Sequence, residues 1–153
     1  MSTIDQQFDR LIELGDRYEA ISDDISAWSV GRHVFHLALS GSSLAVSLIT
    51  GRLWDGVPSA PALKDHILRN GTIPHGRAEA PESVRPAPDP TRDEIVQAIG
   101  KCRSRVARIP SAAVDARMIH PYLGTLTRDE LLVFIAIHNR HHLTIIDRIL
   151  ASG

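Results

Sequence analysis

The segment that most constrains the fold lies near the C-terminus and reads LLVFIAIHNRHHLTIIDRIL, residues Leu131 to Leu150. Residues that recur at alternating steps of four and three mark the face that a helix buries. In this segment they are Leu131, Ile135, His138, His142, Ile145 and Ile149. The pattern predicts a long helix whose buried face carries two histidines, one turn apart.

Two inward-facing imidazoles at this spacing admit two interpretations. They are either core residues whose nitrogens find hydrogen-bond partners, since an unpaired buried polar group costs roughly 1–3 kcal/mol, or they are ligands of one metal ion. The i, i+4 spacing is that of the H-E-x-x-H zinc motif, although the glutamate of that motif is absent here. The residues of this helix alone leave both interpretations open.

Helix boundaries can be placed along most of the chain. We expect a first helix over 3–20 and a second over 27–53. A third should start at the cap Thr91 and end before Pro110, and a fourth should start at Thr127. The third and fourth both begin with TRDE, a capping-box sequence. Between the second and third lie roughly forty proline-rich residues, which we interpret as a crossover with a short helix over 62–70, ended by Gly71, and an extended run. No stretch predicts a strand of useful length. The expected fold is therefore all-α, one domain over 1–153, a four-helix bundle with a long crossover between helices 2 and 3.

Charge and cysteine content narrow the function classes. With 17 basic and 18 acidic residues the net charge is −1, which gives no attraction to nucleic acid or to an anionic membrane. The single cysteine, Cys102, excludes an intramolecular disulfide and a cysteine-based zinc finger and fits a reducing compartment. The acidic start MSTIDQQFDRL lacks the pattern of a signal peptide. We expect a cytoplasmic protein that acts on a small-molecule substrate and binds neither nucleic acid nor a membrane. A homodimer is one oligomeric state compatible with the sequence.

The expected second helix carries a narrow polar seam between apolar walls. At 100° per residue, its members fall within roughly 40° of one line; they are Ser29, His36, Ser40, Ser43 and Ser47. Such a seam suits a small polar cavity in a bundle, although serines alone are more typical of close helix packing. His33 and His36 are both candidates for a third metal ligand.

Two motifs carry a family resemblance. "WS" at Trp28 is followed eight residues later by "HL", and the C-terminal part reads HPYLGTLTRDELLVFIAIHNRHH. These motifs, with the pattern G.IP.G.A.AP over 71–81, resemble the DinB-like (DinB/YfiT-like) superfamily along about residues 28–150. The resemblance implies a four-helix bundle whose metal is held by one histidine of the first motif and two of the last helix, which here are His36, His138 and His142. Many members have glutamate four residues after the tryptophan; this chain has Arg32, so a role of that glutamate is not carried over.

The other histidines and Arg32 are candidates for supporting roles. His141 or His33 could act as a general base beside the ligands, and Arg32 could contact an anionic group of a substrate, its alternative being a solvated arginine at the rim. His66 and His75 are expected in loops. His120, which opens HPYLG, is expected near the mouth of the site.

Three neutral imidazoles leave a divalent ion its full charge and an open position, as in catalytic sites. Zn²⁺ or Ni²⁺ suits such ligands better than Fe²⁺ or Mn²⁺. A water on Zn²⁺ reaches a pKa of about 7, and a thiol could take the same position. The hypothesis is a divalent-metal-binding hydrolase or thiol (S-)transferase, with a low-molecular-weight thiol as a candidate substrate. Two alternatives are a non-catalytic metal-binding or stress-response bundle and an interaction module in which the histidines are ordinary core residues.

Overall fold

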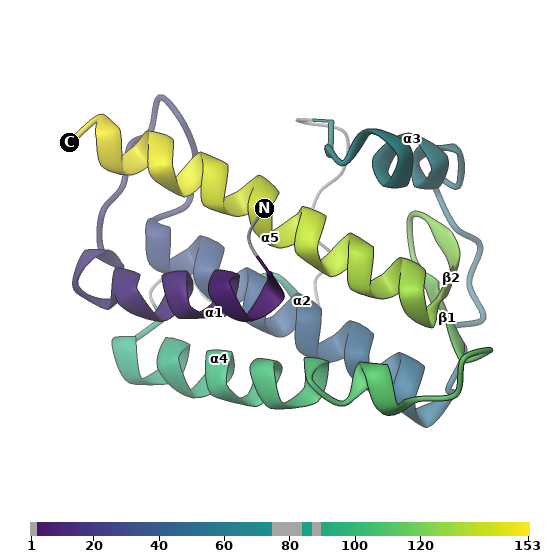
Figure 1. Cartoon of the computed structure of the whole chain (residues 1–153). Helices are drawn as coiled ribbons and strands as arrows, with labels where there is room; N and C mark the ends of the chain where they lie inside the picture. Colours follow the sequence, from purple (N-terminus) through teal and green to yellow (C-terminus); the bar gives the residue numbers. More distant parts are fainter. Residues whose placement is uncertain (1–2, 75–83, 87–89) are drawn as a thin grey trace.

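The chain folds into a bundle of four long helices with a short helix and a hairpin at one end (Figure 1). The computed structural model describes residues 3–74, 84–86 and 90–153. Its helices are α1 (Ile4–Glu13), η1 (Leu14–Arg17), α2 (Val30–Thr50), α3 (Ala62–Asn70), α4 (Arg92–Val106), η3 (Ile109–Ser111) and α5 (Arg128–Ala151), and its strands are β1 (Arg117–His120) and β2 (Gly124–Thr127). The expected all-α bundle with a long connection between its second and third main helices is confirmed.

The long connection gives the bundle an unusual order of directions. Figure 1 shows α2 and α4 running one way and α1 and α5 running the other. Helix α2 packs against both α4 and α5, and α1 packs across the same two helices from the other side. An up-down-up-down bundle would reverse α4 relative to α2, so the crossover is what allows these two helices to run in parallel.

Side-chain caps define where the main helices begin. Ser29, Thr91 and Thr127 each have an extended backbone and a hydroxyl that accepts the amide N–H three residues later. At Thr127 the Glu130 side chain also bonds back to the cap, which completes the predicted capping box. Helix α2 is shorter than the expected 27–53, because Ser29 caps its start and Gly51, at φ 67°, ends it.

The first helix is also shorter than the expected 3–20. Its α-helical part stops at Glu13 and tightens into η1. The chain then turns back to α2, because the carbonyls of Ala20 and Tyr18 accept the first two amide groups of that helix, from Val30 and Gly31. A continuous helix would carry those carbonyls away from the start of α2.

A two-stranded hairpin precedes α5, where no strand was expected. Strands β1 and β2 pair antiparallel, with Met118 opposite Leu126 and His120 opposite Gly124, which has φ 82°. Each strand has only four residues, so the hairpin is compatible with the expected all-α fold without a strand of useful length. It was not foreseen, because four residues are too few for an alternating pattern to be distinguished from other structure. The hairpin fixes His120 and leads directly into α5.

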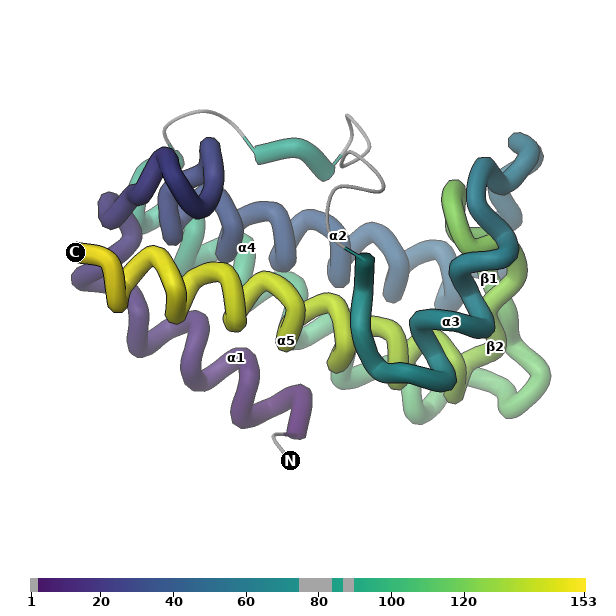
Figure 2. The backbone as a smooth tube through the Cα atoms, turned by 90° about the horizontal axis from the view of Figure 1, so that it is seen from above, coloured from purple at the N-terminus to yellow at the C-terminus, as the bar shows by residue number. Residues whose placement is uncertain are grey.

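The predicted short helix 62–70 is confirmed, with Gly71 at φ 69° as its C-terminal cap. Figure 2 shows α3 lying across one end of α5, and the Arg140 guanidinium of α5 donates to the Gly71 carbonyl. Most of the predicted proline-rich run, including His75, lies outside the described residues. Of that run, Val84 is buried and contacts α2 through His36.

Among the described residues, α2 alone is long and apolar enough to cross a membrane, by length and composition. Its most apolar stretch has a mean hydropathy of 1.3, and 61% of that stretch is buried inside the bundle. A core helix of a globular bundle meets the same criterion, so this observation is weak evidence for a membrane span.

Candidate metal centre

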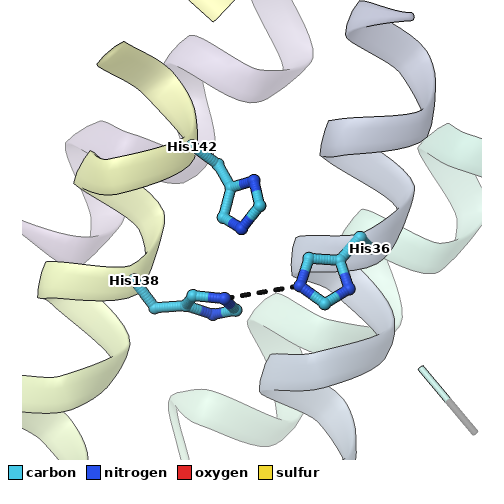
Figure 3. A group of neighbouring side chains, drawn as sticks. All are labelled: His36, His138 and His142. Carbon is cyan, nitrogen blue, oxygen red and sulfur yellow. Dashed lines mark hydrogen bonds between the residues drawn. The ribbon is translucent and has the colours of Figure 1, made fainter. Parts of the chain in front are cut away.

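Three histidines from two helices meet inside the bundle. His36 extends from α2, and His138 and His142 extend from successive turns of α5, with their rings converging on one point (Figure 3). One nitrogen from each of the three lies within 4.8 Å of the others. The structure thus brings together the three residues that the family resemblance implied as ligands.

The spacing of these nitrogens fits a small divalent ion. Nitrogens bound at 2.0–2.1 Å in a tetrahedral site lie about 3.4 Å apart. The Nε2 atoms of His36 and His138 are 3.3 Å apart. The limit of 4.8 Å for the whole group requires only a small closing of the rings. The donor set of three imidazoles suits Zn²⁺ or Ni²⁺, so the residues fit the implied metal.

Hydrogen bonds outside the cluster fix two of the three rings. The Nδ1–H of His36 donates to the Val84 carbonyl at 2.9 Å, which leaves the Nε2 lone pair directed into the cluster. The Nδ1 of His142 lies 2.9 Å from the Nδ1 of His33. The ring of His138 stacks on Phe134 at a centroid separation of 5.5 Å. These contacts hold the rings in orientations compatible with ligation.

Burial keeps the clustered imidazoles neutral. Desolvation is the main cause that lowers the pKa of His36, and the Val84 carbonyl opposes part of that shift. Burial, followed by neighbouring histidines, lowers the pKa of His138 and His142 well below the ordinary value. Only a neutral imidazole has a lone pair for a metal. At neutral pH all three side chains are therefore in the protonation state that ligation requires.

His33 lies beside the cluster and touches one of its three histidines, His142, directly. It is 3% exposed, and burial, followed by the charges of His36, His141 and Arg32, lowers the pKa of its imidazole to about 4. Its ring is hydrogen-bonded to His142 through Nδ1 and to Ser26 through Nε2. The structure places it next to the candidate site and outside the group of three converging histidines.

Trp28 forms one wall of the site. Its ring lies 5.3 Å from that of His33, 5.4 Å from that of His36 and 6.5 Å from that of His142, nearly parallel to the last. The guanidinium carbon of Arg32 lies 5.4 Å from the same ring, and the Arg32 Nε is buried without a hydrogen-bond partner in the described structure. Arg32 is thus joined to the cluster through Trp28.

His141 and His120 lie around the three clustered histidines in different ways. The ring of His141 meets that of His142 edge-on at 5.3 Å. His120 accepts the backbone N–H groups of Tyr122 and Leu123 at Nδ1, so its proton is on Nε2. The His120 ring contacts Phe134, which in turn stacks on His138. His120 therefore lies one aromatic ring away from His138.

The other predictions for this region have mixed outcomes. His66, expected in a loop, lies instead on helix α3, where it is exposed and bonded to Asn70, apart from the cluster. Ser40 on the predicted polar seam is buried, but Ser43 is exposed and lines a surface groove between α2 and α4 with Lys101 and Arg105. The seam is covered around His36, where Val84 contacts it, and uncovered two turns further on.

Sequence reasoning missed the hydrogen-bond partners of the clustered histidines and of His33. Ser26 and Val84 carried no signal of their own, because a serine in a loop and a carbonyl in a proline-rich run are found in many contexts. Val84 is 48 positions from His36 and His33 is 109 positions from His142. Only the fold reveals such pairings.

Fold and site together define the chain as a helical bundle with a candidate three-histidine metal centre between α2 and α5. The chain belongs to the DinB superfamily, whose family model matches residues 12–146. A search of curated proteins and a search of solved structures each give no match. The resemblance inferred from the tryptophan and histidine motifs is therefore confirmed.

Proposed function

We propose that this chain binds one divalent metal ion through His36, His138 and His142 and acts on a small molecule at the open position of that ion. The observation that carries the proposal is the convergence of three ligand nitrogens within 4.8 Å on rings whose burial keeps them neutral. Zn²⁺ and Ni²⁺ are the metals that suit three imidazoles. Three protein ligands leave at least one coordination position for a substrate.

The reaction class follows from the charge of such a site. When bound, an ion held by three neutral ligands keeps its double positive charge and lowers the pKa of a water or a thiol that reaches it. Hydrolysis of an ester or amide and transfer of a thiol to an electrophile are the two reactions that this chemistry supports. We place the protein among metal-dependent hydrolases or thiol transferases of the cytoplasm, without nucleic-acid or membrane partners and with a homodimer as an assembly state to test.

The chain's own residues supply the surroundings of the reaction. Trp28 shields one side of the cluster, and the positive charge of Arg32 lies on that ring, where it can attract an anionic group of a substrate. His141 adjoins His142 and is the candidate for moving a proton at its imidazole.

A different function has one observation in its favour. The Nε2 atoms of His36 and His138 are close enough for a direct hydrogen bond, so the two rings can satisfy one another as core residues do. In that case the protein is an interaction module that needs no metal. A metal site closed to other ligands would instead make it a non-catalytic metal-binding bundle.

Cobalt substitution separates these possibilities. Co²⁺ has a visible spectrum that depends on the number and type of its ligands, and it should bind once per chain. Titration of a low-molecular-weight thiol into the Co²⁺ protein should change the spectrum, and the change should be absent in His142→Ala. A bound but unresponsive Co²⁺ would contradict the open site, and no bound Co²⁺ would contradict the metal site itself.

A further inference from the structure

His33 uses both of its nitrogens in a chain of hydrogen bonds that ends on a metal-ligand candidate. Its Nδ1 lies 2.9 Å from the Nδ1 of His142, and its Nε2 lies 2.8 Å from the Ser26 Oγ. The same serine oxygen accepts the backbone N–H of Trp28 at 3.1 Å. This series of hydrogen bonds thus connects the loop before α2 with α2 and, through His142, with α5.

We propose that Ser26 and His33 form a positioning relay that orients His142 and fixes its tautomer for metal binding. The inference rests on the proposed metal site and adds two residues to it. Neither residue touches the ion or the substrate: His33 acts through His142, and Ser26 acts through His33.

The direction of the bonds follows from counting protons. A His142 that binds metal through Nε2 carries its proton on Nδ1 and donates it to the Nδ1 of His33. The single proton of neutral His33 is then on Nε2 and is donated to the Ser26 Oγ. That oxygen receives two donors, His33 and the Trp28 amide, which fills both of its lone pairs. Each ring N–H in the relay has an acceptor when the metal is in place.

His36 and His142 differ in how strictly their hydrogen-bond partners determine their tautomers. His36 faces the Val84 carbonyl, which can only accept, so its Nδ1 must carry the proton with or without metal. His142 faces an imidazole, which can accept or donate. Ser26 can likewise accept from His33 or donate to it, so the relay can run in either direction, and only one direction leaves the Nε2 of His142 free for a metal. We therefore expect the relay to be more sensitive to substitution than a fixed carbonyl.

A plain core would not need this arrangement. His33 is 3% exposed, and a buried imidazole needs a partner for each ring nitrogen, a requirement that an aliphatic side chain of similar size would not impose at that place. Partners outside a metal's own ligands raise the basicity of a ligand and restrict its ring, and their loss typically lowers metal affinity by about 10–100-fold. The relay gives this position of α2 a role that a leucine could not fill.

The test compares three substitutions in the full chain. His33→Leu removes the acceptor and should weaken Co²⁺ and Zn²⁺ binding by about 10–100-fold. His33→Asn places an amide oxygen near the position of Nδ1 and should recover most of that loss. Ser26→Ala, which leaves the Nε2–H of His33 without its acceptor, should have a smaller effect in the same direction. His66→Ala, on the exposed helix α3, is the matched control and should bind as the wild type does.

Two readouts distinguish positioning from general destabilisation. Metal affinity is measured by direct titration under conditions in which circular dichroism shows each variant folded, and the Co²⁺ spectrum reports whether the ligand geometry has changed. A shifted spectrum in His33→Leu that returns toward the wild-type shape in His33→Asn is the result expected. If His33→Leu does not fold, the metal affinities and spectra of His33→Asn and Ser26→Ala still test the relay.

The outcomes that would overturn the inference differ from those that affect the metal site. Wild-type affinity and spectrum in both His33→Leu and Ser26→Ala would contradict the relay while leaving the three-histidine site intact. An asparagine variant as weak as the leucine variant would contradict the acceptor role of Nδ1. A wild-type protein that binds no metal would remove the proposed function first, before any variant is compared.

Discussion

Helix α2 is buried on two sides, one toward α4 and one toward α5, and the two sides differ in the residues that they present. Toward α4 the helix presents glycines: a Cβ on Gly41 would lie 2.8 Å from the Sγ of Cys102, and one on Gly31 would lie 3.0 Å from Ile95. Toward α5 it presents His33 and His36, which are only 3% and 4% exposed. One side achieves close helix packing with the smallest residue, whereas the other encloses polar rings.

The comparison teaches what each side contributes. Apolar groups need only contact, so the α4 side is stabilised by burial itself. Each imidazole on the α5 side needs a partner for two nitrogens and must remain neutral, and the structure meets this need with one carbonyl, one serine and other histidines. Stability should therefore depend mainly on the α4 side and metal affinity on the α5 side.

The largest effect on stability is expected from the packing against α4. Ile99 of α4 is fully buried, and Ile99→Ala should lower the free energy of unfolding by about 2–5 kcal/mol. Chemical denaturation measures the loss. Metal affinity of the folded variant should stay near that of the wild type, and a large drop in affinity at little cost in stability would break the proposed division between the two sides.

The buried histidines next to α5 should make the stability of the protein depend on pH. His120 of β1, which contacts Phe134 of α5, is the example with the clearest expected effect. Burial lowers the pKa of His120 to about 4, below the unfolded value of about 6.5. Between these two values the unfolded chain binds more protons, so stability falls as the pH falls from 6.5 to 4. The loss from this residue is up to about 3 kcal/mol.

His120→Asn isolates this contribution. Asparagine keeps an acceptor for the Tyr122 and Leu123 amides but does not titrate. Metal-free wild-type and variant proteins are unfolded with urea across the pH range, and the variant should lose less stability between pH 6.5 and 4. Parallel curves would show that His120 does not contribute to the acid sensitivity.

A smaller effect is expected at the glycine contact. Gly41→Ala forces the new methyl group against the Cys102 Sγ, and the pair should show a coupling energy of about 1 kcal/mol. The cost of Gly41→Ala should thus be lower in a Cys102→Ala background. Equal costs in the two backgrounds would mean that α2 and α4 move apart freely at this point, which would weaken the contrast between the two sides.

The two sides also differ in how far the sequence predicts them. Helical periodicity predicted a buried face of α5, which the structure shows as buried at Leu131, Ile135 and Ile149 and as half-buried at His138, His142 and Ile145. TRDE marked the starts of α4 and α5 because caps are local signals. The family resemblance selected His36 over His33 as the third ligand candidate. The hairpin before α5 and the bonds from His33 and Val84 were not foreseen, because short strands have no period and these bonds join distant segments. Local physics therefore locates the ligand candidates, and the fold supplies the groups that orient them.

The most direct test of the central claim is the metal content of protein purified without a histidine tag. The three-histidine site predicts about one Zn²⁺ or Ni²⁺ per chain by elemental analysis, close to none in a His36→Ala, His138→Ala, His142→Ala triple variant, and the wild-type amount in His66→Ala. A triple variant that retains its metal, or a wild-type protein that takes up none when Zn²⁺ and Ni²⁺ are supplied, would contradict the claim.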